Sequence, residues 1–216
     1  ECRSLASVTI GNGVTSIGWG AFFSCTFVKS NFVNNSTLDA KANNYWGAQL
    51  ADTDINGLLI RNDTVVGCRP SVTSVIIPNT ITSIGDYAFY HSSLTSVTIP
   101  NSTASIEEGC FYKCPNLSSV TIGDSLISIP KGCFAHCTEL ETVRIGKRVS
   151  SVEEHAFTFC EEIKDIFSYA DTPPKTVENS FGTLSQTTLH VPYSSLESYK
   201  TAKPWHFAKS IIPVVE

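Results

Sequence analysis

The sequence predicts a repeat solenoid, a right-handed superhelix whose coils are about 22–23 residues long, mainly β with short helical and irregular segments. Two observations predict it. An apolar residue recurs at a period of 23 residues, which is typical of stacked structural units. Its clearest members are Leu94, Leu117, Leu140 and Ile163. A V-x-I triplet follows most of them, and this alternation indicates a strand with one buried face.

Each repeat unit reads L-x-x-V-x-I, then I, then A/C-F-x-x-C, and five copies are clear. The first complete copy begins at Leu5. The copy that begins at Val72 has one residue deleted, so that His91 stands where the cysteine is expected. Cys2 precedes Leu5 by three residues, as the cysteines of later copies precede their leucines, and we therefore expect the chain to begin inside a repeat. Stacked coils are expected to pair their strands in parallel.

The segment 28–71 departs from the regular pattern. It contains 44 residues, which equals two periods of 22, so we interpret it as two divergent coils and not as a separate domain. Its strands are expected near 32–33, 58–60 and 65–66. The stretch 43–57 is rich in Asn, Asp and Gly and is expected to bulge as a loop.

The sequence of the C-terminal part of the chain predicts a cap on the solenoid. The Thr-Pro-Pro run at 172–174 interrupts the repeat, because proline continues neither a paired strand nor a helix interior. A strand over 188–192 and a serine-capped helix over 194–201 are expected to follow. A solenoid end must hide its apolar cross-section, which predicts that Trp205, Phe207 and Ile211 cover the last coil. These signals divide the chain into a solenoid over 1–187 and a cap over 188–216.

Composition excludes some classes of partner. The net charge is −5, and no cluster of five or more Lys and Arg occurs, which argues against nucleic-acid binding. The chain has no run of eighteen apolar residues, so this segment is not expected to insert into a membrane.

The repeat motif resembles the BspA-like leucine-rich repeat family. The resemblance rests on residues 94–100 and 83–89 and on the equivalent residues of the other copies, and it covers about residues 1–187. The C-terminal segment around Leu189-His190-Val191-Pro192 also resembles the C-terminal cap of such proteins. It implies a leucine-rich-repeat protein that is secreted or on the bacterial cell surface, with some relatives acting as adhesins for host matrix proteins and for other bacteria. It offers no catalytic motif and no fixed binding residues to transfer, because fold carries over better than function.

Residues that suggest chemistry are better explained by the repeat. The cysteines recur at two positions of the repeat, one that other copies fill with alanine and one three residues before the next leucine. This recurrence favours buried free thiols over disulfides. The alternative is a disulfide between Cys110 and Cys133 in adjacent coils. The spacing of the cysteines does not match a zinc site. The histidines are interpreted as lying at different register positions, which predicts no converging cluster. One serine recurs in register, which favours a hydroxyl ladder bonded to turn backbone over nucleophiles: Ser16, Ser83, Ser105, Ser128 and Ser151.

The middle residue of each V-x-I triplet is expected to point outward from the strand face. These residues are Thr9, Ile76, Thr98, Thr121, Arg144 and Phe167. The face is rich in hydroxyl groups until larger side chains enter near its C-terminal end. Arg144 with Phe167 is a candidate hot spot, because arginine and aromatic residues often anchor interfaces. The alternative is an ordinary solvated β-face.

Trp19 is an anomaly, because charged residues occupy its register in most other copies. With Tyr45 and Trp46 it is a candidate apolar patch for a protein or a sugar ring. The alternative is that Trp19 packs under the loop or against an upstream repeat.

The solenoid and the acidic charge, together with the family resemblance, favour a module that binds a protein in adhesion, such as a host matrix or surface protein; the resemblance implies that this module is extracellular or on the cell surface. The alternatives are a carbohydrate-binding surface protein, for which Trp19, Tyr45 and Trp46 argue, and a structural spacer that presents another domain. We expect no enzyme, cofactor or metal, since no nucleophile, base and orienting group can be placed together.

Overall fold

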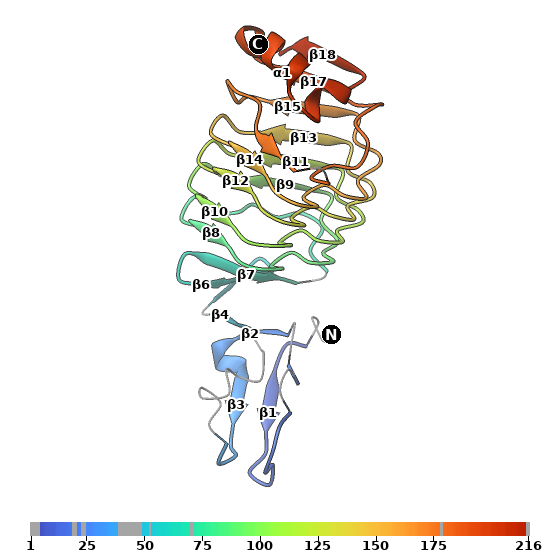
Figure 1. Ribbon diagram of the computed structural model, residues 1–216. Coiled ribbons are helices and arrows are strands. Elements are labelled where there is room, and N and C mark those ends of the chain that lie inside the picture. Colours follow the sequence, from blue (N-terminus) through green and yellow to red (C-terminus); the bar gives the residue numbers. More distant parts are fainter. Residues whose placement is uncertain are drawn as a thin grey trace.

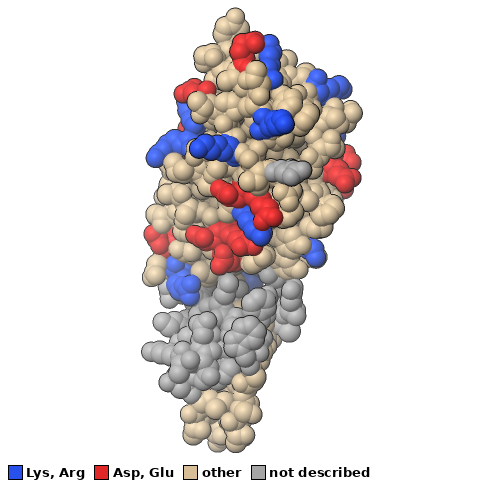
Figure 2. All heavy atoms as spheres, viewed as in Figure 1, with Lys and Arg blue, Asp and Glu red and all other residues tan. Residues whose placement is uncertain are grey.

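The computed structural model describes residues 5–18, 21–22, 25–38, 49–51, 53–69, 71–177 and 179–214. Successive coils stack from residues 58–68 to the C-terminal cap, whereas strands 8–10 and 32–34 form a separate two-stranded sheet below this stack in Figure 1. The predicted solenoid is confirmed. On the face seen in Figure 2, acidic and basic side chains are interspersed, with several acidic groups near its middle. Within the described ranges, no helix combines the length and the apolar character needed to cross a bilayer.

The V-x-I triplets form the main sheet, whose six strands are parallel and run in the order β18-β17-β15-β13-β11-β9. Val97, Val120 and Val143 are in register, as the 23-residue period predicts. In five of these strands, all but β18, the second and fourth residues are buried and face the core. The strands are β9 (Ser96–Ile99), β11 (Ser119–Ile122), β13 (Thr142–Ile145), β15 (Asp165–Ser168), β17 (Thr188–Val191) and β18 (Ser210–Pro213).

A second set of two-residue strands carries the serine register. These strands are β8 (Ser83–Ile84), β10 (Ser105–Ile106), β12 (Ser128–Ile129), β14 (Ser151–Val152) and β16 (Lys175–Thr176). Ser105 Oγ donates to Ser83 Oγ at 2.9 Å, and Ser151 Oγ donates to Ser128 Oγ at 2.8 Å. Two steps of the predicted hydroxyl ladder are therefore confirmed, Ser83 to Ser105 and Ser128 to Ser151. The expected bonds to turn backbone were wrong at Ser128 and Ser151, whose hydroxyl oxygens both lie 2.9 Å from Oε1 of Glu153.

The main core runs from Leu58 to Trp205 as a continuous apolar column that contains a ladder of phenylalanine rings. Two smaller clusters, around Phe27 and around Leu59, are separate from it. Neighbouring rings are nearly parallel, with centroids 4.7–5.2 Å apart. The ladder contains Phe89, Phe111, Phe134, Phe157 and Phe181, and all five rings are buried. From Phe89 to Phe157 each coil contributes the phenylalanine of its repeat motif, and Phe181 extends the ladder. Phe22 of the first copy instead packs in a separate cluster with Phe27.

Cys110, Cys133, Cys137 and Cys160 are buried free thiols, as predicted. Cys114, Cys137 and Cys160 donate to the carbonyl oxygens of phenylalanines in the preceding coil. Sγ of Cys110 and Sγ of Cys133 are 3.3 Å apart in adjacent coils.

One register assignment was wrong. Ser92, and not His91, replaces the cysteine of its copy, because its side chain is buried and its Oγ lies 3.3 Å from Cys114 Sγ. The copy that begins at Val72 also lacks the expected strand: residues 72–77 form none, and β9 is the edge of the main sheet.

The irregular N-terminal region combines parallel and antiparallel pairs. The predicted strands near 32–33, 58–60 and 65–66 are confirmed, but β5, β6 and β7 pair antiparallel before β7 joins β8 in parallel. The predicted loop 43–57 was wrong for residues 49–51 and 53–55, which form strands. Asn56 and Gly57 have positive φ and allow the tight turn between β5 and β6. The elements are β1 (Val8–Ile10), β2 (Thr26–Val28), η1 (Lys29–Asn31), β3 (Phe32–Asn34), β4 (Gln49–Ala51), β5 (Thr53–Ile55), β6 (Leu58–Arg61) and β7 (Thr64–Cys68).

The cap contains η3 (Tyr193–Ser195), α1 (Leu196–Thr201) and η4 (Trp205–Phe207), followed by β18, a strand that the sequence did not predict. Trp205 is fully buried and meets the Phe181 ring edge-on, with centroids 5.1 Å apart, so it closes the phenylalanine ladder as expected. Phe207 is 58% exposed, and its predicted role in covering the last coil was wrong. Ser195 makes no side-chain cap; its hydroxyl donates to Asp171 O.

Candidate binding surfaces

The outward residues of the main sheet form a ladder along the strand face. Thr98, Thr121, Arg144 and Phe167 occupy neighbouring positions, as predicted. The same ladder continues to His190 on β17 and Ile212 on β18. Small hydroxyl side chains therefore give way to large ones toward the C-terminal end of this face.

Arg144, Phe167 and His190 form one stack of planar groups, which we call the strand-face stack. The Arg144 guanidinium carbon lies 4.1 Å from the centroid of the Phe167 ring. The His190 ring lies on the other side, with its centroid 4.1 Å from that of Phe167 and the planes 10° apart. Parallel strands lie about 4.8 Å apart, so in-register side chains of adjacent strands stack directly. The sheet thus orders three interface-forming side chains before any ligand arrives.

Hydrogen bonds and burial restrain the stack. Asp165 Oδ1 and His190 Nε2 are 2.7 Å apart, which fixes the imidazole over the phenylalanine ring. Arg144 Nη1 is shielded from water and has no hydrogen-bond partner among the residues that the structure describes. The guanidinium is therefore partly desolvated, which strengthens its attraction to the ring.

The remaining predicted site residues do not join the stack. Ile76 is 89% exposed, but it lies outside the main sheet and before β9. Trp19, Tyr45 and Trp46 lie outside the described residues, so the aromatic patch proposed for them stays a prediction.

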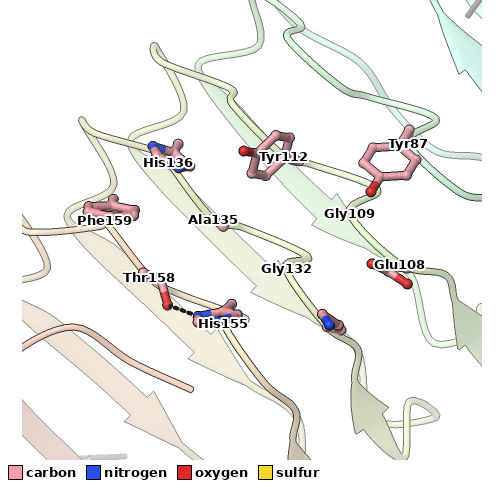
Figure 3. A pocket seen from close by; sticks show the side chains of 11 residues that line it. Tyr87, Glu108, Gly109, Tyr112, Gly132, Ala135, His136, His155, Thr158 and Phe159 are labelled. Atoms are coloured by element: carbon pink, nitrogen blue, oxygen red, sulfur yellow. Dashed lines mark hydrogen bonds between the residues drawn. The ribbon is translucent and has the colours of Figure 1, made fainter. Parts of the chain in front are cut away.

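A second surface lies at a corner of the coils, where the chain turns from the short strands toward the phenylalanine ladder. This corner groove has a volume of about 410 Å³. Tyr87, Gly109, Gly132 and His155 occupy one register, and all four have positive φ, between 52° and 60°. Two aromatic side chains therefore flank two glycines, and the hollow lies where the glycines have no side chain (Figure 3).

The two glycines are not equivalent. A Cβ on Gly109 would lie 2.4 Å from Cε1 of Tyr87, so the absent side chain lets the tyrosine ring lie over the backbone. A Cβ on Gly132 would meet nothing within 4 Å, so the space above it is open. Backbone bonds between coils hold the floor, since Gly109 N donates to Lys131 O and Gly132 N donates to Glu154 O, both at 3.0 Å.

Aromatic side chains line one side of the groove. Tyr112 meets the His136 ring edge-on, and His136 stacks on Phe159 with centroids 4.4 Å apart. Tyr87 lies beside Tyr112, and Phe159 is 52% exposed. Figure 3 shows these four side chains in a row, with Glu108 and His155 across the floor from them.

The polar side of the groove is charged. Lys131 Nζ and Glu154 Oε2 form an exposed ion pair at 2.9 Å. Desolvation raises the pKa of Tyr87, and the charges of Glu108 and Asp86 raise it further. Desolvation also lowers the pKa of His136, with a smaller effect from the charge of Lys113. Among the described residues, no group of three or more His, Cys, Asp or Glu side chains is placed to hold a metal ion.

The sequence matches the BspA type leucine rich repeat region in six copies, over residues 1–57 and 58–188. The chain belongs to the BspA-type leucine-rich repeat family. Among solved structures, it is 21% identical to a leucine rich cell surface protein from Faecalibacterium prausnitzii, with a TM-score of 0.57; the match covers 99% of this chain and 49% of that one.

A second solved structure, the pneumococcal vaccine antigen PcpA, is 14% identical with a TM-score of 0.56, over 98% of this chain and 56% of that one. The chain therefore spans about half the length of these two proteins. At these identities the likeness shows the fold alone. No curated protein matches the sequence.

The sequence of this BspA-type repeat did not lead us to predict two features of the strand face and the corner groove. His190 occupies the middle of Leu189-His190-Val191, a triplet like V-x-I, so its place on the strand face was readable from the pattern. The expectation that the histidines occupy different positions was wrong, because His91 and His136 share one left-handed register position. His136 and His155 also line the same groove. The sequence signal for the corner groove was the glycine that directly precedes both Cys110 and Cys133.

Proposed function

We propose that this chain is a non-catalytic binding module of an extracellular or cell-surface protein, and that it acts in adhesion by binding a protein ligand such as a host matrix protein. The family and the stacked coils support this function, because a solenoid presents an extended and rigid surface to a partner. No cofactor or metal takes part.

The observation that carries the proposal is the strand-face stack. Arginine and aromatic side chains that are ordered and partly desolvated are the usual anchors of protein interfaces. Arg144 and Phe167 are already in contact in the free molecule, so little side-chain entropy is lost when a partner binds. The preceding Thr98 and Thr121 leave a shallow neighbouring surface that a partner can cover.

A binding screen against immobilised host matrix proteins tests this function. We expect saturable binding to at least one of them. Arg144→Ala and Phe167→Ala should each weaken that binding by about tenfold or more, because truncation of an interface anchor costs roughly 2 kcal/mol. Binding is measured by surface plasmon resonance.

Phe207→Ala is the matched control, since it removes an exposed aromatic ring outside the stack. It should leave the affinity within about twofold, because residues outside an interface contribute little to binding. The proposal is rejected if no matrix protein binds saturably, or if the two stack variants bind as tightly as the unmodified chain.

A further inference from the structure

The corner groove contains an empty space above Gly132. Gly132 lies in the register that carries Tyr87 and His155 in other coils, and the space that their side chains would fill is empty above it. Backbone bonds between adjacent coils hold the floor. The groove is therefore preformed, and a ligand does not need to open it.

The charge around the groove is predominantly negative. Glu108 lines the groove itself. The adjoining hollow shares His136 and Phe159 with it and is also lined by Glu139, Glu161 and Glu162. Lys131 pairs with Glu154 and its charge also acts on Glu108 and Tyr87, while Lys113 lies over the Tyr112 ring. Because carboxylates outnumber ammonium groups around the two hollows, the net charge favours a cation.

The aromatic side chains suit the same kind of ligand. A cation is attracted to the face of an aromatic ring, and a carboxylate nearby adds a charge-assisted hydrogen bond. Lys113 Nζ lies 5.3 Å from the Tyr112 centroid, so one ring of the groove wall already holds an ammonium group. Tyr87 and Glu108 offer the same combination beside the open space.

The size of the groove indicates a short peptide. Its lining runs from Tyr87 to Phe159 across four coils. Three steps of about 4.8 Å give a length of roughly 14 Å, which accommodates about four residues of extended chain at about 3.3 Å each.

We propose that the corner groove is a second binding site, separate from the strand face, for an extended basic peptide. One lysine or arginine side chain of the peptide enters the space above Gly132, with its charge near Glu108 and the Tyr87 ring. Neighbouring basic residues face Glu139, Glu161 and Glu162. Apolar residues of the peptide pack against Phe159 and His136.

The test uses a fluorescent six-residue peptide of alternating arginine and leucine, titrated with the whole chain and followed by anisotropy. Gly132→Tyr should weaken binding at least tenfold, because the new ring fills the open space. Tyr87 already adopts the same left-handed conformation in this register, so the coil tolerates the substitution. Gly132→Ala adds only a methyl group there and should change the affinity less than threefold.

Further variants keep the test decisive if Gly132→Tyr folds poorly. Glu108→Gln and Phe159→Ala should each weaken binding at least threefold, whereas Tyr193→Ala, an exposed residue of the cap, should not change it. A peptide of alternating glutamate and leucine should not bind. Equal affinity for a folded Gly132→Tyr variant, equal affinity for the glutamate peptide, or binding of a neutral hexasaccharide in place of the arginine peptide would overturn the proposal.

Discussion

At the scale of single residues, the repeat explains most side chains that first suggest chemistry. The phenylalanine of each coil is the clearest case, because its ring contacts one ring above and one below. Phe134 is fully buried, and its centroid lies 5.2 Å from those of both Phe111 and Phe157. One truncation therefore removes two stacking contacts and leaves a cavity in the middle of the column.

Phe134→Ala should lower the free energy of unfolding by roughly 3–5 kcal/mol, since it combines lost burial with an unfilled cavity. Phe134→Leu keeps most of the volume and should cost less. Both changes are measured by urea denaturation followed by circular dichroism. Thr98→Ala, at an exposed position of β9, is the control and should cost under about 0.5 kcal/mol. Equal costs for Phe134→Ala and Thr98→Ala would show that the ring ladder does not stabilise the fold.

At the scale of elements, the cap protects the C-terminal end of the column. Trp205 closes the phenylalanine ladder, and its Nε1 donates to Pro174 O at 2.9 Å. Tyr199 of α1 is buried beside it, and its hydroxyl lies 2.7 Å from Ser168 Oγ in the main sheet. The 3-10 turn η4 and the helix α1 thus seal the last coil together.

Trp205→Ala should destabilise the protein by roughly 3–5 kcal/mol and expose the last coils to local opening. Amide hydrogen exchange should lose protection first in β17 and β18. Phe207→Ala, in the same 3-10 turn but exposed, should change stability by less than about 0.5 kcal/mol. Unchanged protection of β17 and β18 in Trp205→Ala would contradict the sealing role of the cap.

At the scale of the whole molecule, stability depends on keeping the core neutral. Burial raises the pKa of Cys68 to about 12 and raises the pKa of Cys110 and Cys137 well above the ordinary thiol value. The unfolded chain, in contrast, ionises its thiols near pH 8.5, at about the ordinary thiol value. The stabilisation is therefore complete below about pH 8.5 and is lost as the pH rises through the folded pKa values.

We therefore expect the free energy of unfolding to fall above about pH 8.5, by up to roughly 1.4 kcal/mol per pH unit for each such thiol. Urea midpoints measured from pH 7 to pH 10 check this. Cys110→Ala should make the decline shallower, and Ala88 and Ala156 show that the register accepts alanine. If the decline is equally steep in Cys110→Ala, ionisation of this thiol does not account for it.

The sequence by itself determined the solenoid, its period, the inward valines and isoleucines, and the pairing of Arg144 with Phe167. These follow from local periodicity, because residues one period apart must meet when coils stack. Only the tertiary structure decided the antiparallel β5-β6-β7 unit and the corner groove. The groove forms because Gly109 and Gly132 have no side chains, while aromatic side chains of the neighbouring coils line the space that is left. Such a hollow belongs to no single repeat, so it becomes visible only when the coils are in place.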